Sequence, residues 1–521
     1  MQEAIMKARG TRAMGLTLIA LLGLSVPART LDAQGSEQRY RAVDAAEAAR
    51  VLVADSVVIT EDTAIIRGEA VPYRVQTGTQ PVWDGNGNVI ASVFYVAYVR
   101  ADVEDPSRRP LTFSFNGGPG AASVWMHIGY TGPRRVIVDD EGFPVQPYGV
   151  VNNPHSVLDV TDLVFVDPVN TGFSRPVGDA SREHFFGVNQ DIAYLAEWID
   201  TWVSRNHRWE SPKYLIGESY GTTRVAGLSH RLQSHHRMHL NGVVLVSPTA
   251  LGLNPQGPEP RAAVLKLPYY AATAWYHRQL DPTLQNRDLH DLLPEVEVFT
   301  LDELLPALAR GGFLDPERRS ELARQVARYS GLSEEVVRNN NLAVSESRFW
   351  KELLRHEGYT VGRLDSRYKG VDRDDGGETR EFDAAIAAWG HSFTPAINHY
   401  LRHDLGWETD LRYYIGGQTG GWDRSGDTTG EDLRRALAEN PFLHVMIQGG
   451  FYDGATDYFS AKYTMWNLDP SGKLRNRLRF EGYRSGHMMY LRKEDLETSN
   501  EHIREFIQES TPGAGTPAMW R

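Results

Sequence analysis

The chain contains one G-x-S-x-G pattern, Gly217-Glu218-Ser219-Tyr220-Gly221. The apolar residues 214–216 before it are typical of a buried strand, and residues 222–232 after it are typical of a helix. A serine on a tight turn between a strand and a helix presents its hydroxyl at the carboxyl edge of a sheet, and the flanking glycines avoid Cβ clashes. The helix N-terminus directs backbone N–H groups at an anion formed there. Ser219 is therefore a candidate nucleophile, with an ordinary strand–turn–helix connection as the alternative.

Apolar runs typical of buried strands recur on both sides of this turn. They occupy residues 110–115, 163–166, 213–216, 243–246 and 443–447. Residues 190–203, between two of these runs, have helical periodicity, with Ile192, Leu195 and Ile199 on one face. Nearer the N-terminus, the turn residues 84–87 separate two β-like stretches, the second at 89–99. Strands that alternate with helices predict an α/β fold class with a mostly parallel central sheet.

From residue 257 to residue 404 the pattern changes to helices. Thr300 and Glu303 fit a capping box, and Asp315 precedes Pro316 at the predicted start of another helix. We expect these residues to form a helical cap inserted into the α/β core. The predicted organisation is a signal peptide at 1–33, the first part of the core with N-terminal β-hairpins at 34–256, the cap at 257–404 and the second part of the core at 405–521.

The N-terminus has the composition of a secretory signal. Lys7, Arg9 and Arg12 precede the apolar segment 14–26, and Ala33 offers a cleavage point. No later segment has an uncharged apolar run long enough to cross a bilayer, so we expect no membrane span in the mature chain. The sequence therefore predicts export to the periplasm or secretion from the cell.

Composition excludes several classes of site. The 521 residues include no cysteine, so disulfides, thiolate metal sites and cysteine nucleophiles are excluded. A formal net charge of −12 argues against a nucleic-acid partner. His399 and His403 are spaced i, i+4 but lack the glutamate of H-E-x-x-H, so a solvated helix face is favoured over a zinc site. We expect neither a metal nor a cofactor.

A serine nucleophile needs a base, an acid that orients the base, and donors for the oxyanion. In the α/β-hydrolase fold these groups follow the chain order serine, acid, histidine. Asp453 follows the strand that ends at 449–450, and His487 follows a short strand at 478–480, so both have the expected order. Asp457 is a competing acid, and His444 lies inside a strand pattern where a packing role is favoured.

The oxyanion donors can also be assigned from position. One is the N–H of Tyr220, directly after the candidate nucleophile. The other must come from a loop after an earlier strand, and the glycine-rich residues 116–120 follow the strand at 110–115. This loop lacks the G-x-G-x-x-G spacing, so a dinucleotide site is not predicted.

Four stretches together resemble the serine carboxypeptidases, peptidase family S10. They are Asn116-Gly117-Gly118-Pro119-Gly120, residues 166–174 (VDPVNTGFS), Gly217–Gly221 and Gly486-His487-Met488. The resemblance runs in order from about Thr112 to Tyr490, and the layout resembles the bacterial exported branch. It implies an α/β-hydrolase fold and release of C-terminal residues from peptides that carry a free carboxylate. The implied roles are nucleophile for Ser219, base for His487, orienting acid for Asp453, oxyanion donors for Gly118 and Tyr220, and substrate carboxylate binding for Asn116, Gly117 and Glu218.

The implied role of Glu218 requires a proton between its carboxyl group and the substrate's carboxylate, because two charges in contact repel. The chain departs from the family pattern at three positions near these motifs. Tyr130 stands where the family usually has a second glutamate that pairs with Glu218, Ala121 replaces a cysteine, and Asp457 replaces a common proline. A serine esterase or acyltransferase of the same fold, and a catalytically inactive binding protein, remain the alternatives.

Overall fold

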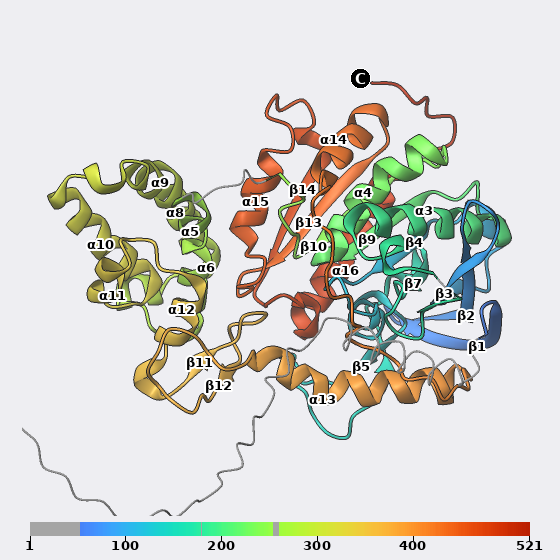
Figure 1. Cartoon of the computed structure of the whole chain (residues 1–521), viewed down its shortest axis with the longest axis horizontal. Coiled ribbons are helices and arrows are strands. Elements are labelled where there is room, and N and C mark those ends of the chain that lie inside the picture. The colour runs from blue at the N-terminus through green and yellow to red at the C-terminus, as the bar shows by residue number, and fades with distance from the viewer. Residues whose placement is uncertain (1–52, 179, 254–259, 521) are drawn as a thin grey trace, which may run out of the picture. The chain divides into compact units, whose positions relative to one another are not determined.

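A ten-stranded sheet forms the centre of the fold (Figure 1). In this computed structural model the described residues are 53–178, 180–253 and 260–520. The strand order is β1-β2-β3-β7-β4-β9-β10-β13-β14, with β8 paired to β3. The strands are β1 (Ser56–Ile66), β2 (Glu69–Trp83), β3 (Val89–Arg100), β4 (Leu111–Phe115), β7 (Asp162–Val166), β8 (Arg175–Pro176), β9 (Lys213–Glu218), β10 (Gly242–Val246), β13 (His444–Gly450) and β14 (Leu478–Tyr483).

Six neighbouring strands of the sheet run parallel: β7, β4, β9, β10, β13 and β14. The strands β1, β2 and β3 form an antiparallel meander, and β3 pairs antiparallel with β7. Every residue of β4, β7 and β10 is buried, as expected for parallel strands covered on both faces. The predicted turn at 84–87 joins β2 to β3. The predicted α/β fold class with a mostly parallel sheet is confirmed.

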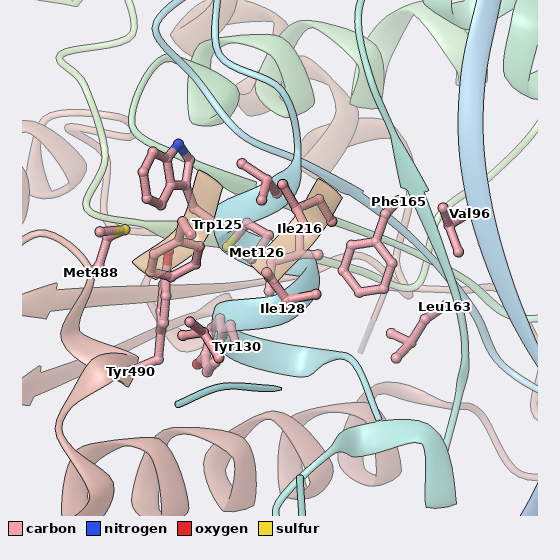
Figure 2. Close-up of a cluster of buried hydrophobic side chains, with 14 of the residues drawn as sticks. Val96, Trp125, Met126, Ile128, Tyr130, Leu163, Phe165, Ile216, Met488 and Tyr490 are labelled. Atoms are coloured by element: carbon pink, nitrogen blue, oxygen red, sulfur yellow. The ribbon is translucent and has the colours of Figure 1, made fainter. Parts of the chain in front are cut away.

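Side chains that alternate along the strands enter two separate cores. Leu215 of β9 packs with α3 (Val188–Arg205), α4 (Tyr220–His235) and α14 (Thr429–Glu439). Ile216, the next residue, packs on the opposite face with residues 124–130 and with α16 (Lys493–Ser510). Figure 2 shows this second core around Ile216, with Trp125 and Tyr130 on one side and Phe165 on the other. Both faces of the sheet are therefore covered at β9, the strand that leads into Ser219.

Residues 260–404, called the helical insertion below, follow β10 and precede the return to the sheet. A third core cluster joins its helices to Phe451 and Tyr452, which directly follow β13. Its helices are α5 (Pro260–Val264), α6 (Leu267–Tyr276), α7 (Pro282–Gln285), α8 (Leu289–Phe299), α9 (Leu305–Leu308), α10 (Pro316–Ser330), α11 (Glu334–Asn339), α12 (Glu346–Glu352) and α13 (Ala384–His399), followed by a π-helical turn at Tyr400–Asp404.

Two predicted helix starts in the insertion had different outcomes. Asp315 caps α10, since its carboxylate accepts hydrogen bonds from the N–H groups of Glu317 and Arg318. The predicted capping box at Thr300 is wrong. Thr300 continues α8 through a π-helical turn, and its hydroxyl donates to the Val296 carbonyl at 2.7 Å. A threonine hydroxyl can donate to a carbonyl one turn earlier inside a helix. The capping-box pattern at Thr300 therefore occurs without a helix N-terminus.

The predicted signal peptide, the predicted start of the core at 34 and the predicted boundary at 257 lie outside the described residues. Within the described part of the chain, none of the helices combines the length and the apolar composition needed to cross a bilayer.

Candidate active site

Ser219 lies on a strained turn between β9 and α4. Its backbone angles are φ 58° and ψ −126°, a combination that non-glycine residues rarely adopt and that costs free energy. The turn is held from both sides, because the Ser219 N–H donates to the Val246 carbonyl at 2.9 Å and the Ser219 carbonyl accepts from Thr222. The serine is partly exposed, whereas Glu218 and Tyr220 beside it are buried. The strain therefore presents one hydroxyl at the carboxyl end of the sheet.

The glycines of the pattern are required by close backbone contacts. A Cβ on Gly217 would lie 2.2 Å from the Gly221 carbonyl oxygen, and a Cβ on Gly221 would lie 2.8 Å from the Phe115 carbonyl oxygen. Both distances are shorter than any real Cβ contact, so side chains at these positions would displace the turn. The second contact also brings the end of β4 against the start of α4.

His487 and Asp453 form a buried pair. The His487 Nδ1 and Asp453 Oδ2 atoms are 2.7 Å apart. Asp453 Oδ1 also accepts from the N–H groups of Ala455 and Thr456, at 2.8 and 3.1 Å. Burial alone would raise the pKa of Asp453, but His487 and these hydrogen bonds outweigh it and hold the pKa below its usual range. The carboxylate therefore stays charged and orients the ring, which leaves Nε2 as the nitrogen opposite the acid.

The pKa of His487 is raised above its ordinary value. Burial would lower this pKa, but the Asp453 carboxylate and, more weakly, Glu218 outweigh burial. Asp457, the competing acid, is engaged elsewhere. It caps α15 (Tyr458–Trp466) through the Ser460 N–H at 2.8 Å and pairs with Lys266 of the helical insertion at 3.4 Å. The structure therefore pairs His487 with Asp453 and gives Asp457 a bridging position.

The end of β10 connects the loops that carry the candidate triad. The Val246 carbonyl accepts from Ser219, as described above. Ser247 donates its hydroxyl to the His487 carbonyl at 2.9 Å, and its own carbonyl accepts from the Thr456 hydroxyl at 2.9 Å. Since β9, β10, β13 and β14 are neighbours in the sheet, the loops after three of these strands meet around one strand end.

The loop after β4 lies against the start of α4. A Cβ on Gly117 would lie 2.5 Å from the Tyr220 nitrogen, and Gly118 has φ +104°, which glycine adopts most readily. Asn116 accepts a hydrogen bond from the Met126 N–H at 3.0 Å through its side-chain oxygen. The predicted oxyanion donors, the N–H groups of Gly118 and Tyr220, therefore belong to two segments that are in direct contact.

Arg224 of α4 binds the loop after β4. Its guanidinium donates to the Asn116 carbonyl at 2.5 Å and pairs with Asp191 of α3 at 2.8 Å. Tyr194 donates to the same aspartate at 3.1 Å. Arg224 and Asp191 are both fully buried, so the pair fixes the loop after β4 to the helix that begins at the candidate nucleophile.

Glu218 is a fully buried carboxyl group beside Ser219. The Tyr490 hydroxyl donates to its Oε1 at 2.7 Å, and the Asn116 side-chain amide donates to its Oε2. Burial, reinforced by the nearby Asp453 charge, raises the pKa of Glu218 to about 7, against the opposing effects of His487 and the two hydrogen bonds. At neutral pH and below, a large fraction of Glu218 therefore carries a proton.

Tyr130, which stands where the family usually has a glutamate that pairs with Glu218, does not donate to Glu218. Its hydroxyl donates to Gln448 Oε1 at 2.9 Å, and its ring stacks on Tyr490 with centroids 4.5 Å apart (Figure 2). Sequence reasoning missed Tyr490 as the phenol that contacts Glu218. The sequence feature that could have indicated Tyr490 is its position three residues after His487, at the end of the region that resembles the serine carboxypeptidases.

The other candidate histidines take no part in this site. His444 is half-buried at the start of β13, and burial lowers its pKa. The rings of His399 and His403 stack with centroids 4.5 Å apart. No group of three or more potential ligands in the described ranges is arranged to hold a metal ion.

A strained serine turn followed by an acid and a histidine after later parallel strands is the arrangement of the α/β-hydrolases. The model of the serine carboxypeptidase family matches residues 82–253. Serine carboxypeptidase-like 45 of Arabidopsis thaliana is 28% identical over 165 residues, which are 29% of this chain and 32% of that protein. Serine carboxypeptidase 1 of Hordeum vulgare is 26% identical over 167 residues, 31% of each chain. The matched segment thus spans about a third of the length of these relatives.

A likeness of fold extends further than the likeness of sequence. The crystal structure of Kex1(Δ)p, a prohormone-processing carboxypeptidase from Saccharomyces cerevisiae, covers 84% of this chain and 92% of its own, with a TM-score of 0.51 and 15% identity. The predicted α/β-hydrolase fold and the predicted resemblance to the serine carboxypeptidases are confirmed. The bacterial exported branch stays a prediction.

Proposed function

We propose that the chain is a serine-type carboxypeptidase that removes C-terminal residues from peptides through an acyl-enzyme on Ser219. The observation that carries this proposal is Glu218. A buried carboxyl group with a pKa of about 7 directly precedes the candidate nucleophile. When protonated, it can donate a hydrogen bond to a substrate's terminal carboxylate, which an ionised glutamate would repel.

In this mechanism the Ser219 Oγ attacks the carbonyl carbon of the last peptide bond. The Nε2 atom of His487 takes the hydroxyl proton and then delivers it to the leaving amine, so that the C-terminal amino acid departs. Water next attacks the acyl-enzyme, with His487 again as the base, and the shortened peptide is released. Asp453 keeps the ring oriented, as supported by the 2.7 Å contact at Nδ1.

The oxyanion would be bound by the N–H groups of Gly118 and Tyr220. The close approach of Gly117 to the Tyr220 nitrogen supports this assignment, because the two segments that carry these donors are in contact. Asn116, Gly117 and Glu218 would hold the terminal carboxylate, supported by the hydrogen bond from Asn116 to Glu218. No step requires a metal or a cofactor.

The proposal also includes export and a cap. The basic and apolar residues of the N-terminus support cleavage near Ala33 and a periplasmic or secreted location. The contacts of the helical insertion with Tyr452 and Asp457, which flank Asp453, support a cap role for residues 257–404.

The test compares a blocked dipeptide with the same peptide amidated at its C-terminus. We expect the amidated peptide to lose most of the rate, because it lacks the terminal carboxylate that Asn116, Gly117 and Glu218 would bind. Equal rates on both, or a strong preference for esters irrespective of a free carboxylate, would instead indicate the esterase or acyltransferase. Labelling by a fluorophosphonate, abolished in Ser219→Ala, reports the nucleophile separately. An unlabelled wild-type protein would indicate an inactive binding protein.

A further inference from the structure

A short segment of the helical insertion runs along both loops that carry the candidate acid and base. It is the tip of the hairpin formed by β11 (Thr360–Val361) and β12 (Lys369–Gly370). We call residues 362–368 the strap. The strap belongs to the insertion by sequence, yet it also forms main-chain hydrogen bonds with the loops that follow β13 and β14 in the sheet.

Main-chain hydrogen bonds join the strap to residues on both sides of Asp453. The Gly454 N–H donates to the Arg363 carbonyl at 2.8 Å, and the Ser366 N–H donates to the Tyr452 carbonyl at 3.0 Å. The His487 N–H donates to the Leu364 carbonyl at 2.6 Å. The strap backbone is thus bonded to His487 itself and to both chain neighbours of its acid.

Side chains of the strap close the same contact. A Cβ on Gly486 would lie 2.4 Å from the Asp365 Cβ, so the strap and the histidine loop touch at van der Waals distance. Arg367 pairs with Asp365 at 2.6 Å and donates to the Ser485 hydroxyl at 3.1 Å. The two charged side chains are only 1% exposed, which leaves this pair little room to rearrange.

The strap is in turn anchored within the insertion. The Tyr269 hydroxyl of α6 lies 2.5 Å from the Ser366 hydroxyl, and His277 Nε2 lies 2.6 Å from the Ser366 carbonyl oxygen. Asp383, which caps α13, accepts from the N–H groups of Arg363 and Leu364 at 3.2 and 3.3 Å. The position of the strap therefore depends on two helices of the insertion.

We propose that the strap sets the geometry of the Asp453–His487 pair, with Asp365 as its main positioning residue. This inference rests on the proposed function, since it treats that pair as the acid and base of the reaction. It makes the helical insertion part of the catalytic apparatus, because the insertion adds three main-chain bonds to the bond from Tyr452 to Ser485 that joins the two loops directly. A shift of the insertion would move the base without altering the nucleophile turn.

The test compares Asp365→Asn with Asp372→Asn as a matched control. Asp372 pairs with Lys351 at 2.6 Å, and both side chains of that pair are 3% exposed. Each variant removes the charge of one buried ion pair in the insertion, but neither Asp372 nor Lys351 bonds to the strap or to the catalytic loops among the described contacts. Thermal unfolding measures the stability loss of both variants.

We expect Asp365→Asn to lower kcat by roughly tenfold or more with little change in KM, because small displacements of a base are costly. Asp372→Asn, at equal loss of stability, should keep kcat. Asp453, Glu218 and Arg363 all act on the His487 charge. A loosened Asp453 contact should therefore lower the pKa of His487, measured by NMR titration on protein with 15N-labelled histidine. The His487 resonance is identified by its absence in His487→Gln.

Tyr269→Phe is the second variant, since it keeps the ring and removes the hydroxyl that contacts Ser366 and also accepts from the Trp350 indole N–H at 2.7 Å. It should shift kcat and the His487 pKa in the same direction as Asp365→Asn, by a smaller amount. Equal kcat losses in Asp365→Asn and Asp372→Asn, or an unchanged His487 titration in Asp365→Asn, would overturn the proposal. The titration is independent of turnover. A chain that never hydrolyses peptides but shows the shift would reject the proposed function and keep the strap's role.

Discussion

The nucleophile turn and the acid–base loops are built in different ways. The conformation of the Ser219 turn depends on a short local pattern, because the glycines at 217 and 221 permit backbone contacts that a Cβ would block. The turn also bonds to the Val246 carbonyl at the end of the neighbouring strand β10. Asp453 and His487 are 34 residues apart and are held by a segment of the insertion that lies about a hundred residues before them in the chain. The shape of the nucleophile turn can therefore be recognised from a local pattern, whereas the geometry of the acid–base pair depends on long-range packing. Changes on the two sides should have different signatures.

The largest effect is expected at the acid. Asp453→Asn should lower kcat by about 10⁴-fold, because an amide no longer fixes the histidine tautomer. Asp457→Asn should keep kcat within about threefold and lower the free energy of unfolding by about 1–3 kcal/mol, since Lys266 keeps Glu346 as a partner at 2.6 Å. Steady-state kinetics and chemical unfolding measure the two effects. A large kcat loss in Asp457→Asn would show that the base side is not held as described.

A smaller effect, confined to the nucleophile side, is expected from pH. In the proposed mechanism Glu218 would bind the substrate's carboxylate only when protonated, so KM for a free-carboxylate peptide should rise above about pH 7 by up to about tenfold per unit. Glu218→Gln should remove this rise, because an amide does not titrate. Initial rates over about pH 4 to 8 provide the measurement. A wild-type KM that stays flat over this range would reject the role of Glu218.

The pH profile also separates the two sides. The pKa of His487 is raised, so protonation of the base should reduce kcat at the acid end of the profile, opposite to the effect on KM. The same peptide amidated at its C-terminus serves as the control. Its kcat should still fall at acid pH because of His487, but its KM should not rise at higher pH because of Glu218.

The smallest effects are expected at the two stacked tyrosines. The Tyr490 hydroxyl lowers the pKa of Glu218, so Tyr490→Phe should move the rise in KM to higher pH. Tyr130→Phe should leave the profile in place and cost about 1 kcal/mol of stability through its lost bond to Gln448. The comparison of the two profiles tests whether Tyr490, which follows the base in sequence, serves the carboxyl group on the nucleophile side. Identical shifts in both variants would contradict this assignment.

What the sequence predicted follows the same division. The Ser219 turn, its flanking strands and the glycine loop at 116–120 were readable because each depends on residues close together in the chain. Asp453 was preferred over Asp457 through the family resemblance, because both lie in one loop and only the partners His487 and Lys266 distinguish them in the structure. Tyr490 and the strap escaped prediction because their contacts join residues far apart in sequence. The prediction of a capping box at Thr300 was wrong for a local reason, because the Thr300 hydroxyl donates to a carbonyl inside the helix.

The backbone of Ser219 has a consequence for engineering. At φ 58° and ψ −126° the residue that fits best is glycine, which has no hydroxyl. Heat-tolerance screens that read only soluble, folded protein would therefore reward loss of the nucleophile at this position. A thermostable catalyst from this chain has to be selected by turnover, and its gains in heat resistance have to come from positions outside the turn.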